Sequence, residues 1–290
     1  MITIFTPTYN RAYIITQLYK SLCAQSNQNF EWLIVDDGST DQTESVIQAF
    51  INDNEIKIRY YKQENGGKHR AINRGVELAE GELFFIVDSD DYLHADAVKF
   101  YSKAYEGVRE NDEIAGVSGR RMNANGTYIG SRMNFQMKDC TALDLRMKYN
   151  IEGDMAEAYK TSVLKKYPFP DIAGEKFCPE SLVWNRISQK YFLRFYNEGY
   201  YYCEYLGDGL TSKIAALRMK SPETSMLYYS ELEKFNIPYL EKLKANINYW
   251  RFGFNSNGSF LDKQKKVDLG RTLIGMAIGF SMYMKDKKQL

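Results

Sequence analysis

Short apolar runs alternate with helix-like segments over the first hundred residues of the chain. We expect strands at 2–6, 31–35, 56–61 and 83–87, and helices at about 11–24, 41–50 and 68–79. Strands that alternate with helices at this spacing predict an α/β fold with a mostly parallel, twisted sheet flanked by helices. The polar loops that follow the strands should then lie along one edge of the sheet.

Two of these helices carry capping signals at their expected starts. Asn10 is the predicted N-cap of the first helix. Asp41 and Glu44 have the spacing of a capping box, which predicts that the second helix begins between them.

The run from Glu82 to Asp91 joins a buried strand to a group of acids. Residues 83–87 are all apolar or aromatic, which is typical of a strand that is buried on both faces. Three carboxylates follow within four positions, those of Asp88, Asp90 and Asp91. Like charges at this spacing favour a divalent cation such as Mg²⁺ or Mn²⁺. The alternative is a solvated turn with an aspartate N-cap.

The other loops at strand ends carry groups that suit a nucleotide. Backbone groups and the ring of Tyr9 follow the first strand, and Asp36 and Asp37 follow the second. Residues 66–67 are glycines, which allow close backbone approach, and Lys68 next to them can meet a phosphate. Each feature taken alone is equally typical of a turn, a cap or a surface lysine.

The amino-acid composition and the first residues indicate which partners and which cellular location to expect. The 38 Lys and Arg residues nearly balance the 37 Asp and Glu residues, so nucleic acid is not an expected partner. The first residues lead directly into a strand, which indicates no secretory signal and favours a cytoplasmic location. The four cysteines are scattered and are expected to be free thiols.

Four motifs occur in a characteristic order: TPTYNR, VDDGSTD, NGGKHRAINRG and FIVDSDD. Together they resemble the inverting family 2 glycosyltransferases of the GT-A, Rossmann-like fold. The resemblance implies a nucleotide pocket, most often for uridine, and a DxD metal motif. The residues it assigns to the nucleotide sugar are Thr6, Pro7, Thr8, Tyr9, Asp36, Asp37, Lys68, His69, Asp88 and Ser89.

The same resemblance makes Asp90 the direct ligand of Mn²⁺ or Mg²⁺, assisted by Asp88 or Asp91. Many family members have an arginine where this chain has Ile72, which leaves the diphosphate contact to Lys68, His69 or Arg70.

The second half is predicted to bind the acceptor. We expect strands at 114–119 and 155–159, a hairpin turn at 123–126, and a helix with Glu180 in its first turn. The family commonly has Glu-Asp at this point, with the second acid as general base. This chain has Glu180-Ser181, so Glu180 becomes the candidate base, with a helix-stabilising acid as the alternative. Asp154 could face the acceptor, and Thr211 or Lys213 could contact the diphosphate.

The domain organisation follows from this division. Residues 1–212 form the expected glycosyltransferase domain, with a nucleotide-sugar half at 1–100 and an acceptor half at 101–212, and residues 213–290 form a helical appendage. Its apolar stretch 273–284 would be about 18 Å long as a helix, too short to cross a bilayer. A packed helix is favoured there, and the lysines at 285, 287 and 288 make peripheral membrane contact the alternative.

The expected function is therefore metal-dependent, inverting transfer of a sugar from a nucleoside diphosphate, most simply UDP, to a hydroxyl group. The acceptor would be a glycan or a lipid-linked glycan of polysaccharide biosynthesis, at the inner face of the membrane. A nucleotidyltransferase with a similar sheet and a non-catalytic nucleotide-sugar-binding protein are the alternatives.

Overall fold

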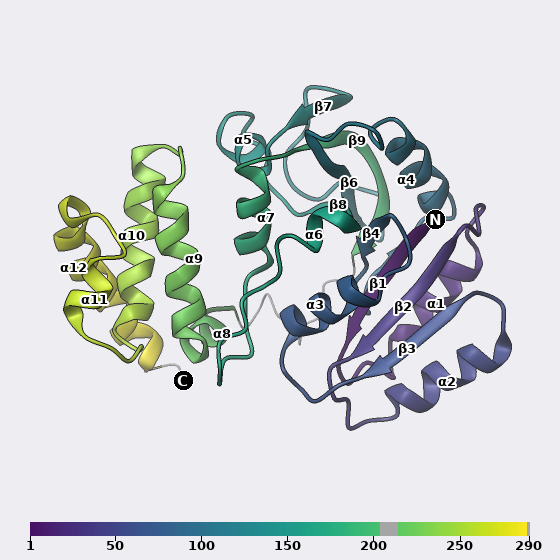
Figure 1. Cartoon of the computed structure of the whole chain (residues 1–290), viewed down its shortest axis with the longest axis horizontal. Helices are drawn as coiled ribbons and strands as arrows, with labels where there is room; N and C mark the ends of the chain where they lie inside the picture. Colours follow the sequence, from purple (N-terminus) through teal and green to yellow (C-terminus); the bar gives the residue numbers. More distant parts are fainter. Residues whose placement is uncertain (204–213, 289–290) are drawn as a thin grey trace. The chain divides into compact units, whose positions relative to one another are not determined.

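The computed structural model describes residues 1–203 and 214–288 (Figure 1). The described chain forms two compact units, residues 1–168 with 186–203 and residues 169–185 with 214–288. The strands are β1 (Ile2–Thr8), β2 (Phe30–Asp36), β3 (Ile58–Lys62), β4 (Leu83–Ile86), β5 (Tyr92–Leu93), β6 (Ile114–Asn123), β7 (Met137–Cys140), β8 (Met155–Lys160) and β9 (Phe192–Cys203).

The helices of the first half are α1 (Ile15–Cys23), α2 (Thr43–Asp53), α3 (Lys68–Leu78), α4 (Ala97–Glu106), α5 (Ala142–Met147) and α6 (Thr161–Leu164). Those that follow are α7 (Glu180–Ser188), α8 (Ile214–Lys220), α9 (Pro222–Lys234), α10 (Tyr239–Gly253), α11 (Phe260–Gln264) and α12 (Leu269–Lys287).

The described strands form one sheet in the order β3-β2-β1-β4-β8-β6-β9-β5, with β7 paired to β9. The first four strands in the chain are mutually parallel, as their alternation with helices predicts. β8 then runs antiparallel to both β4 and β6, so the parallel half joins a mixed half. This arrangement confirms the predicted α/β class.

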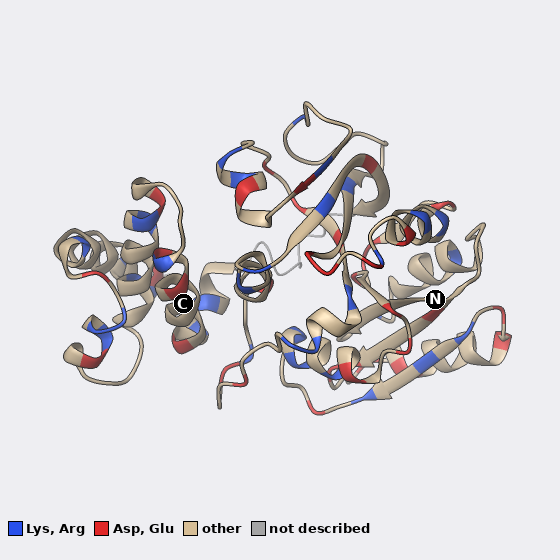
Figure 2. Ribbon diagram, turned by 45° about the horizontal axis from the view of Figure 1, so that its top comes forward, with Lys and Arg blue, Asp and Glu red and all other residues tan. Residues whose placement is uncertain are grey.

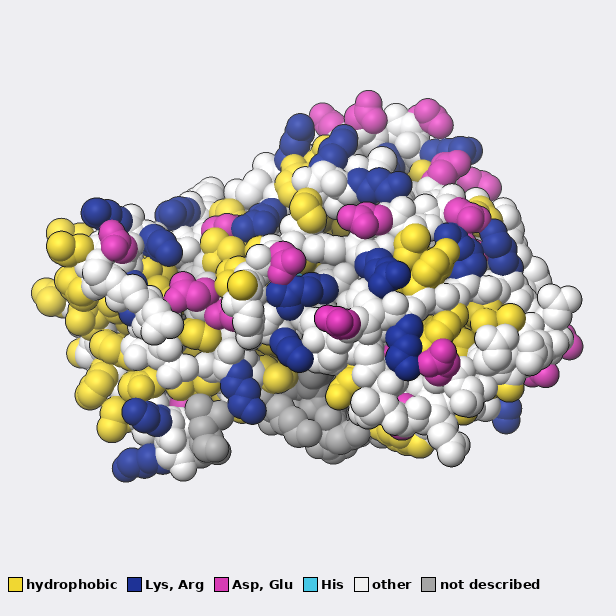
Figure 3. Space-filling model, turned by 60° about the horizontal axis from the view of Figure 1, so that its bottom comes forward, with side chains coloured by type: hydrophobic (Ala, Val, Ile, Leu, Met, Phe, Trp, Pro, Cys, Tyr) yellow, Lys and Arg dark blue, Asp and Glu magenta, His cyan; other side chains and the backbone are white. Residues whose placement is uncertain are grey.

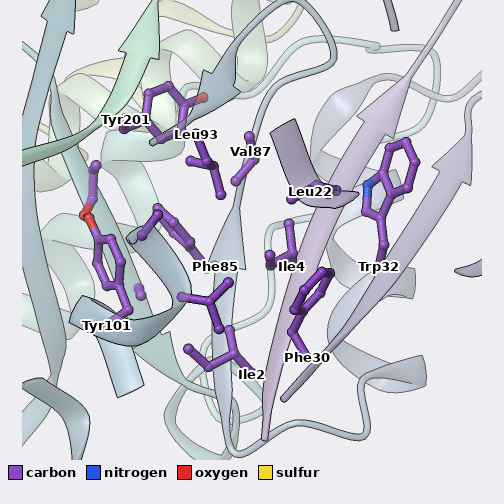
Figure 4. Close-up of a cluster of buried hydrophobic side chains, with 14 of the residues drawn as sticks. Ile2, Ile4, Leu22, Phe30, Trp32, Phe85, Val87, Leu93, Tyr101 and Tyr201 are labelled. Carbon is purple, nitrogen blue, oxygen red and sulfur yellow. The ribbon is translucent and has the colours of Figure 1, made fainter. Parts of the chain in front are cut away.

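The core of this first unit surrounds the parallel strands (Figure 4). Every residue of β1, β2 and β4 is buried, which explains why these strands lack the alternation of a half-exposed strand. The Tyr19 ring stacks on Phe50 at a centroid distance of 4.0 Å and lies 6.2 Å from Trp32. Large aromatic rings therefore pack α1 and α2 against the same face of the sheet.

The predicted capping role of Asn10 is wrong. The N-cap of α1 is Ile14, and Asn10 adopts a left-handed backbone conformation with a φ of 52°. Its Oδ1 accepts the backbone N–H of Thr40 at 2.8 Å instead. An asparagine side chain can accept a hydrogen bond from a backbone N–H at a helix start or in a loop. Here the donor is a backbone N–H of the neighbouring loop.

The capping box predicted for α2 is also absent. The N-cap is Gln42, and Asp41 accepts the backbone N–H of Thr43 at 3.0 Å. Glu44 forms a 2.7 Å ion pair with Lys62 on β3 rather than turning back to the helix start. The helix begins one residue later than the box requires.

From residue 214 onward, the described part of the second unit is mainly helical. Pro222 opens α9 and Pro238 is the N-cap of α10, as expected for proline at a helix start. Its core contains Met226, Tyr249 and Trp250 among other buried residues. Within the described ranges, no helix combines the length and the apolar character that crossing a bilayer requires.

Residues 169–185 group with this helical unit, whereas the sequence places them in the first domain. Buried Glu175 provides one reason, because its carboxylate accepts the backbone N–H groups of Glu223 and Thr224 at 2.7 and 2.8 Å. These are donors at the first turn of α9, which an acid satisfies well. The predicted boundary at 212/213 itself lies outside the described residues.

The four cysteines are all free thiols, as their spacing predicts. Cys140, Cys178 and Cys203 are buried, and Cys23 is half-buried. A buried free cysteine packs as a small apolar residue.

Candidate active site

The polar loops after β1, β2 and β4 meet at one edge of the sheet, as predicted. Thr8 is the register partner of Asp36, and the backbone N–H of Asp37 donates to the Thr8 carbonyl at 2.8 Å. On the other side of β1, the N–H of Val87 donates to the Phe5 carbonyl at 2.9 Å. The carboxyl ends of parallel strands are where open α/β sheets bind their ligands.

The residues of the first loop differ in how they could serve a ligand. Thr6 is fully buried, and its Oγ1 accepts the indole N–H of Trp32 at 2.9 Å, so its side chain belongs to the core. Pro7 lies within β1, and Tyr9 just beyond it is 46% exposed. Thr8 Oγ1 is buried and has no hydrogen-bond partner among the residues that the structure describes. A buried hydroxyl without a partner is a natural contact for a ligand.

Asp36 is held by the protein around it. Its Oδ1 accepts the backbone N–H of Ser39 at 2.7 Å, and its Oδ2 accepts the hydroxyl of Tyr60 at 2.8 Å. The side chain is fully buried. These bonds fix the loop that follows β2, and a contact from Asp36 to a nucleotide stays a prediction.

Asp37 shapes the glycine loop. Its carboxylate accepts the backbone N–H groups of Gly66 at 2.9 Å and Gly67 at 2.7 Å, as well as side-chain bonds from Gln63 and Asn65. Gly67 has a φ of 97°, a conformation that glycine adopts without strain. Four donors occupy the acceptor capacity of this carboxylate, so a nucleotide would have to replace one of them.

Lys68 connects this loop to the acids. It is the first residue of α3, and its Nζ lies 2.6 Å from Asp88 Oδ1. His69 follows it and is buried. A lysine at a helix start adds its charge to the positive end of the helix dipole and so concentrates positive charge beside the acidic loop.

The four residues of the acidic loop have different exposures. Asp88 and Asp90 are half-buried, whereas Ser89 and Asp91 are buried. The first and third positions of the predicted DxD motif are therefore the more accessible ones. Asp91 instead faces the protein.

Tyr201 and Arg121 hold the buried side of this loop. The Tyr201 hydroxyl donates to Asp91 Oδ2 at 2.6 Å and accepts the backbone N–H of Asp88 at 3.0 Å. The Arg121 guanidinium lies over the Tyr201 ring, 4.4 Å from its centroid, and its Nη1 is 3.7 Å from Asp91 Oδ2. Tyr201 lies beside Leu93 and Val87 in Figure 4. No sequence motif assigns either residue to the site.

The local charges displace the pKa values of the acids in different directions. Burial raises the pKa of Asp88, but the charges of Lys68 and Arg121 outweigh it and hold that pKa below its ordinary value. Burial and the nearby charge of Asp88 raise the pKa of Asp90. The same two causes raise the pKa of Asp91 to about 7. The loop thus carries negative charge that its cations balance only in part.

This donor set fits a hard divalent cation. Mg²⁺ and Mn²⁺ prefer carboxylate oxygens, and a nucleotide-binding site commonly supplies one or two of these while phosphates complete the coordination. Across residues 1–203 and 214–288, no group of three or more His, Cys, Asp and Glu side chains is arranged as a complete metal site. The two accessible carboxylates, Asp88 and Asp90, fit an ion that is shared with a bound diphosphate.

The structure places two of the site residues that the sequence predicts in the second half of the chain. Glu180 is half-buried in the first turn of α7, which confirms the predicted helix start, and Ser181 follows it. Asp154 is exposed just before β8. Thr211 and Lys213 lie outside the described residues.

The chain is similar to known glycosyltransferases. The model of the family "Glycosyl transferase family 2" matches residues 3–164. The poly(ribitol-phosphate) beta-N-acetylglucosaminyltransferase TarS of Staphylococcus aureus (strain Mu50 / ATCC 700699) is 30% identical over 169 residues, which are 56% of this chain and 28% of TarS. The chondroitin synthase of Pasteurella multocida (strain Pm70) is 33% identical over 137 residues, 47% of this chain and 14% of that protein. These matches thus cover less than a third of either relative.

Solved structures support the same fold. S. aureus TarS 1–349 in complex with UDP-GlcNAc has a TM-score of 0.68 at 20% sequence identity, over 99% of this chain and 90% of that one. The mannosyltransferase PcManGT from Pyrobaculum calidifontis, in complex with GDP-Man and Mn²⁺, has a TM-score of 0.57 at 16% identity, over 99% of this chain and 82% of that one. This likeness confirms the expected GT-A architecture.

Proposed function

The chain belongs to glycosyl transferase family 2, and on that premise we propose that it moves a sugar from a UDP-sugar to a hydroxyl group of a bacterial glycan or lipid-linked glycan. As a glycosyltransferase it takes its sugar from a nucleotide donor. The uridine nucleotide and the acceptor class are the proposed parts. TarS structures contain UDP-GlcNAc and UDP, and the names of the relatives refer to polymers as acceptors or products.

The observation that carries the proposal is the pairing of Lys68 with the acidic loop. The 2.6 Å contact from Lys68 to Asp88 brings a cation and the start of α3 to the carboxylates that follow β4. A diphosphate needs both kinds of group, since its own oxygens are neutralised by lysine and by a metal that carboxylates hold. The hydroxyl of Thr8, which is buried and has no hydrogen-bond partner within the described ranges, supplies a further contact at the same edge.

The proposed roles follow from position and charge. Asp90 is the principal ligand of Mg²⁺ or Mn²⁺, and Asp88 assists it. A bound divalent ion supplies Lewis acidity and neutralises charge on the departing diphosphate. Lys68 turns from Asp88 to the phosphates and stabilises the same charge. Tyr9 stacks on the base, and Asp36 with the Asp37 loop surrounds the nucleoside.

Glu180 is the proposed general base. It removes the proton from the acceptor hydroxyl while that oxygen bonds to the anomeric carbon, and the bond from that carbon to the diphosphate oxygen breaks. UDP leaves as the second product, and the single displacement inverts the anomeric configuration. Ser181, which replaces the second acid of the usual pair, has no group that would accept a proton at neutral pH.

A thermal-shift panel tests the donor site. UDP, GDP, dTDP and CMP are each added with Mn²⁺ and with EDTA, because a ligand that binds the native state raises the melting temperature by mass action. We expect a shift with UDP that requires Mn²⁺ and that is lost in Asp90→Asn. Asp112→Asn removes an exposed acid elsewhere on the same unit and should respond like the wild type.

Three results would each overturn part of the proposal. A UDP shift of equal size in EDTA, or full transferase activity of Asp90→Asn, would remove the metal role of the acidic loop. A shift confined to GDP or dTDP would leave the site intact and replace the proposed nucleotide.

A further inference from the structure

Six large apolar side chains of helix α12 are exposed to solvent. They are Leu269, Leu273, Ile274, Ile278, Phe280 and Met284, each between 41% and 82% exposed. At about 100° per residue they fall in two rows on the solvent-facing half of the helix: Leu269, Leu273, Phe280 and Met284 lie along one side, and Ile274 and Ile278 lie along the other, over about 22 Å of helix. We call these six residues the α12 stripe. Figure 3 shows the hydrophobic side chains that gather over this end of the chain, at the left of the view.

The opposite face of α12 fixes this orientation. Its buried positions are small or polar: Thr272, Gly275, Gly279 and Asp286. A Cβ added at Gly279 would lie 2.7 Å from the Ile247 carbonyl oxygen of α10, so only glycine permits this approach. Asp286 also forms an ion pair with Arg251 of α10 at 2.5 Å. Close packing and a buried charge pair therefore hold the stripe outward.

Aromatic side chains extend the apolar surface toward α11. Phe280 lies 5.2 Å from the Phe254 ring, and Phe260 of α11 lies 5.4 Å from Trp250, which contacts Phe254 in turn. Phe260 and its neighbour Leu261 are 50% and 67% exposed. Exposed apolar side chains that gather on one surface mark an interaction site.

The part of the chain that carries this apolar surface has an excess of positive charge. Residues 214–288 contain 13 Lys and Arg against 7 Asp and Glu, although the whole chain is nearly neutral. Exposed lysines lie at both ends of α12: Lys265 and Lys266 come before it, Lys285 and Lys287 are in its last turn, and Lys288 is its C-cap. Figure 2 shows Lys and Arg distributed over these C-terminal helices. The partner of this region should therefore combine an apolar interior with negative charge.

We propose that the α12 stripe docks on the surface of a bilayer that contains anionic lipids. The helix lies in the plane of the membrane, with the stripe at the boundary of headgroups and acyl chains and the lysines on lipid phosphates. A second copy of the chain fits less well, because it would bring an equal positive excess to the same surface. This inference does not depend on the proposed transferase reaction.

Vesicle co-sedimentation of the whole chain tests the proposal. The probes are vesicles of phosphatidylcholine alone and of phosphatidylcholine with about one third phosphatidylglycerol, at low and high salt. We expect at least tenfold stronger binding to the anionic vesicles, and loss of most of that preference at high salt.

Variants separate the apolar from the ionic contribution. The double variant Leu273→Glu/Ile278→Glu should bind at least tenfold more weakly, and so should the triple variant Lys285→Gln/Lys287→Gln/Lys288→Gln on anionic vesicles. Leu273→Gln changes a single 82% exposed side chain and keeps the test valid if the double variant does not fold. Met137→Glu, at a 52% exposed residue of β7, is the matched control and should bind normally.

Three results would overturn the proposal. The first is equal, weak binding to both kinds of vesicle. The second is unchanged binding by folded stripe variants. The third is self-association, seen by sedimentation velocity and lost in Leu273→Gln, without vesicle binding, which would make a second copy the occupant.

Discussion

Tyr201 and Asp91 lie 110 positions apart in the chain, yet the Tyr201 hydroxyl donates a 2.6 Å hydrogen bond to Asp91 Oδ2. The Tyr201 hydroxyl oxygen also accepts the backbone N–H of Asp88 at 3.0 Å. One hydroxyl of β9 thus joins both ends of the acidic loop that follows β4. This contact makes Tyr201 a positioning residue for the proposed metal site.

Tyr201→Phe should weaken Mn²⁺ binding by about 10- to 100-fold, because groups that orient metal ligands contribute at this level. It should also lower the free energy of unfolding by about 1–3 kcal/mol, since the buried Asp91 carboxylate loses a donor. Calorimetric Mn²⁺ titration in the presence of UDP measures the first effect, and urea unfolding measures the second.

Tyr202→Phe provides the matched control. Tyr202 is the next residue on β9, and its ring stacks on Tyr92 rather than contacting the acidic loop. An equal loss of Mn²⁺ affinity in both variants would contradict a specific role for the Tyr201 hydroxyl.

Lys68→Met should weaken UDP binding by about 10- to 100-fold, since a charge-assisted hydrogen bond contributes about 1.5–3 kcal/mol. The Lys68 charge also holds the pKa of Asp88 down, so the variant should raise that pKa and shift Mn²⁺ binding to higher pH. Titration of UDP and Mn²⁺ from pH 8 down to about pH 3.5, near the ordinary pKa of an aspartate, checks both effects.

Lys62→Met is the comparison for Lys68. Lys62 forms a 2.7 Å ion pair with Glu44, and both side chains are exposed. An exposed pair of this kind contributes little, so its loss should leave UDP binding unchanged. Normal UDP affinity in Lys68→Met would refute the diphosphate role.

Glu180→Gln should lower kcat by about 100- to 10,000-fold and leave UDP affinity unchanged, because a general base acts on the acceptor hydroxyl. Glu223→Gln changes the corresponding first-turn acid of α9 and tests whether such an acid only stabilises its helix. Comparable kcat values for the two variants would leave Glu180 with the structural role.

Glu31 should make the stability of the first unit depend on pH. Its buried carboxylate accepts the Thr3 hydroxyl at 2.6 Å, the Glu80 N–H at 2.8 Å and Arg59 Nη1 at 2.9 Å. Burial raises the pKa of Glu31, but these donors outweigh it and lower that pKa below its ordinary value. Its contribution is then complete above the unfolded pKa of about 4.3 and is lost as pH falls toward the folded value.

Glu31→Gln should therefore lower the free energy of unfolding by about 3 kcal/mol at pH 7, because Arg59 loses its buried partner. Below about pH 4.5, the free energy of unfolding of the variant should fall less steeply with pH than that of the wild type. Urea unfolding at pH 7 and pH 4 measures both effects. Glu82→Gln, which breaks an exposed pair with Arg109, should cost less than about 1 kcal/mol. If the stability of Glu31→Gln still falls steeply below about pH 4.5, other carboxylates cause the pH dependence.

The first hundred residues were predictable because their signals are local. The continuous apolar run 83–87 and the acids after it indicate a buried strand end without reference to the rest of the chain. The short strands β5 and β7 and the helix α5 were not predicted, because a few residues carry no readable periodicity. Pairing with β9 decides β5 and β7 instead.

The sequence alone determined the alternation of strands and helices, the family, and the residue types that stand at the edge of the sheet. Tertiary structure decided their partners: Asp37 with the Gly66–Gly67 backbone, Lys68 with Asp88, and Asp91 with Tyr201 and Arg121. It also decided that α12 packs through its glycines and exposes six of its large apolar residues. Local sequence patterns predict which side chains lie at a strand end or on a helix face. The pairings between those side chains depend on strand order and helix packing, which no short segment specifies.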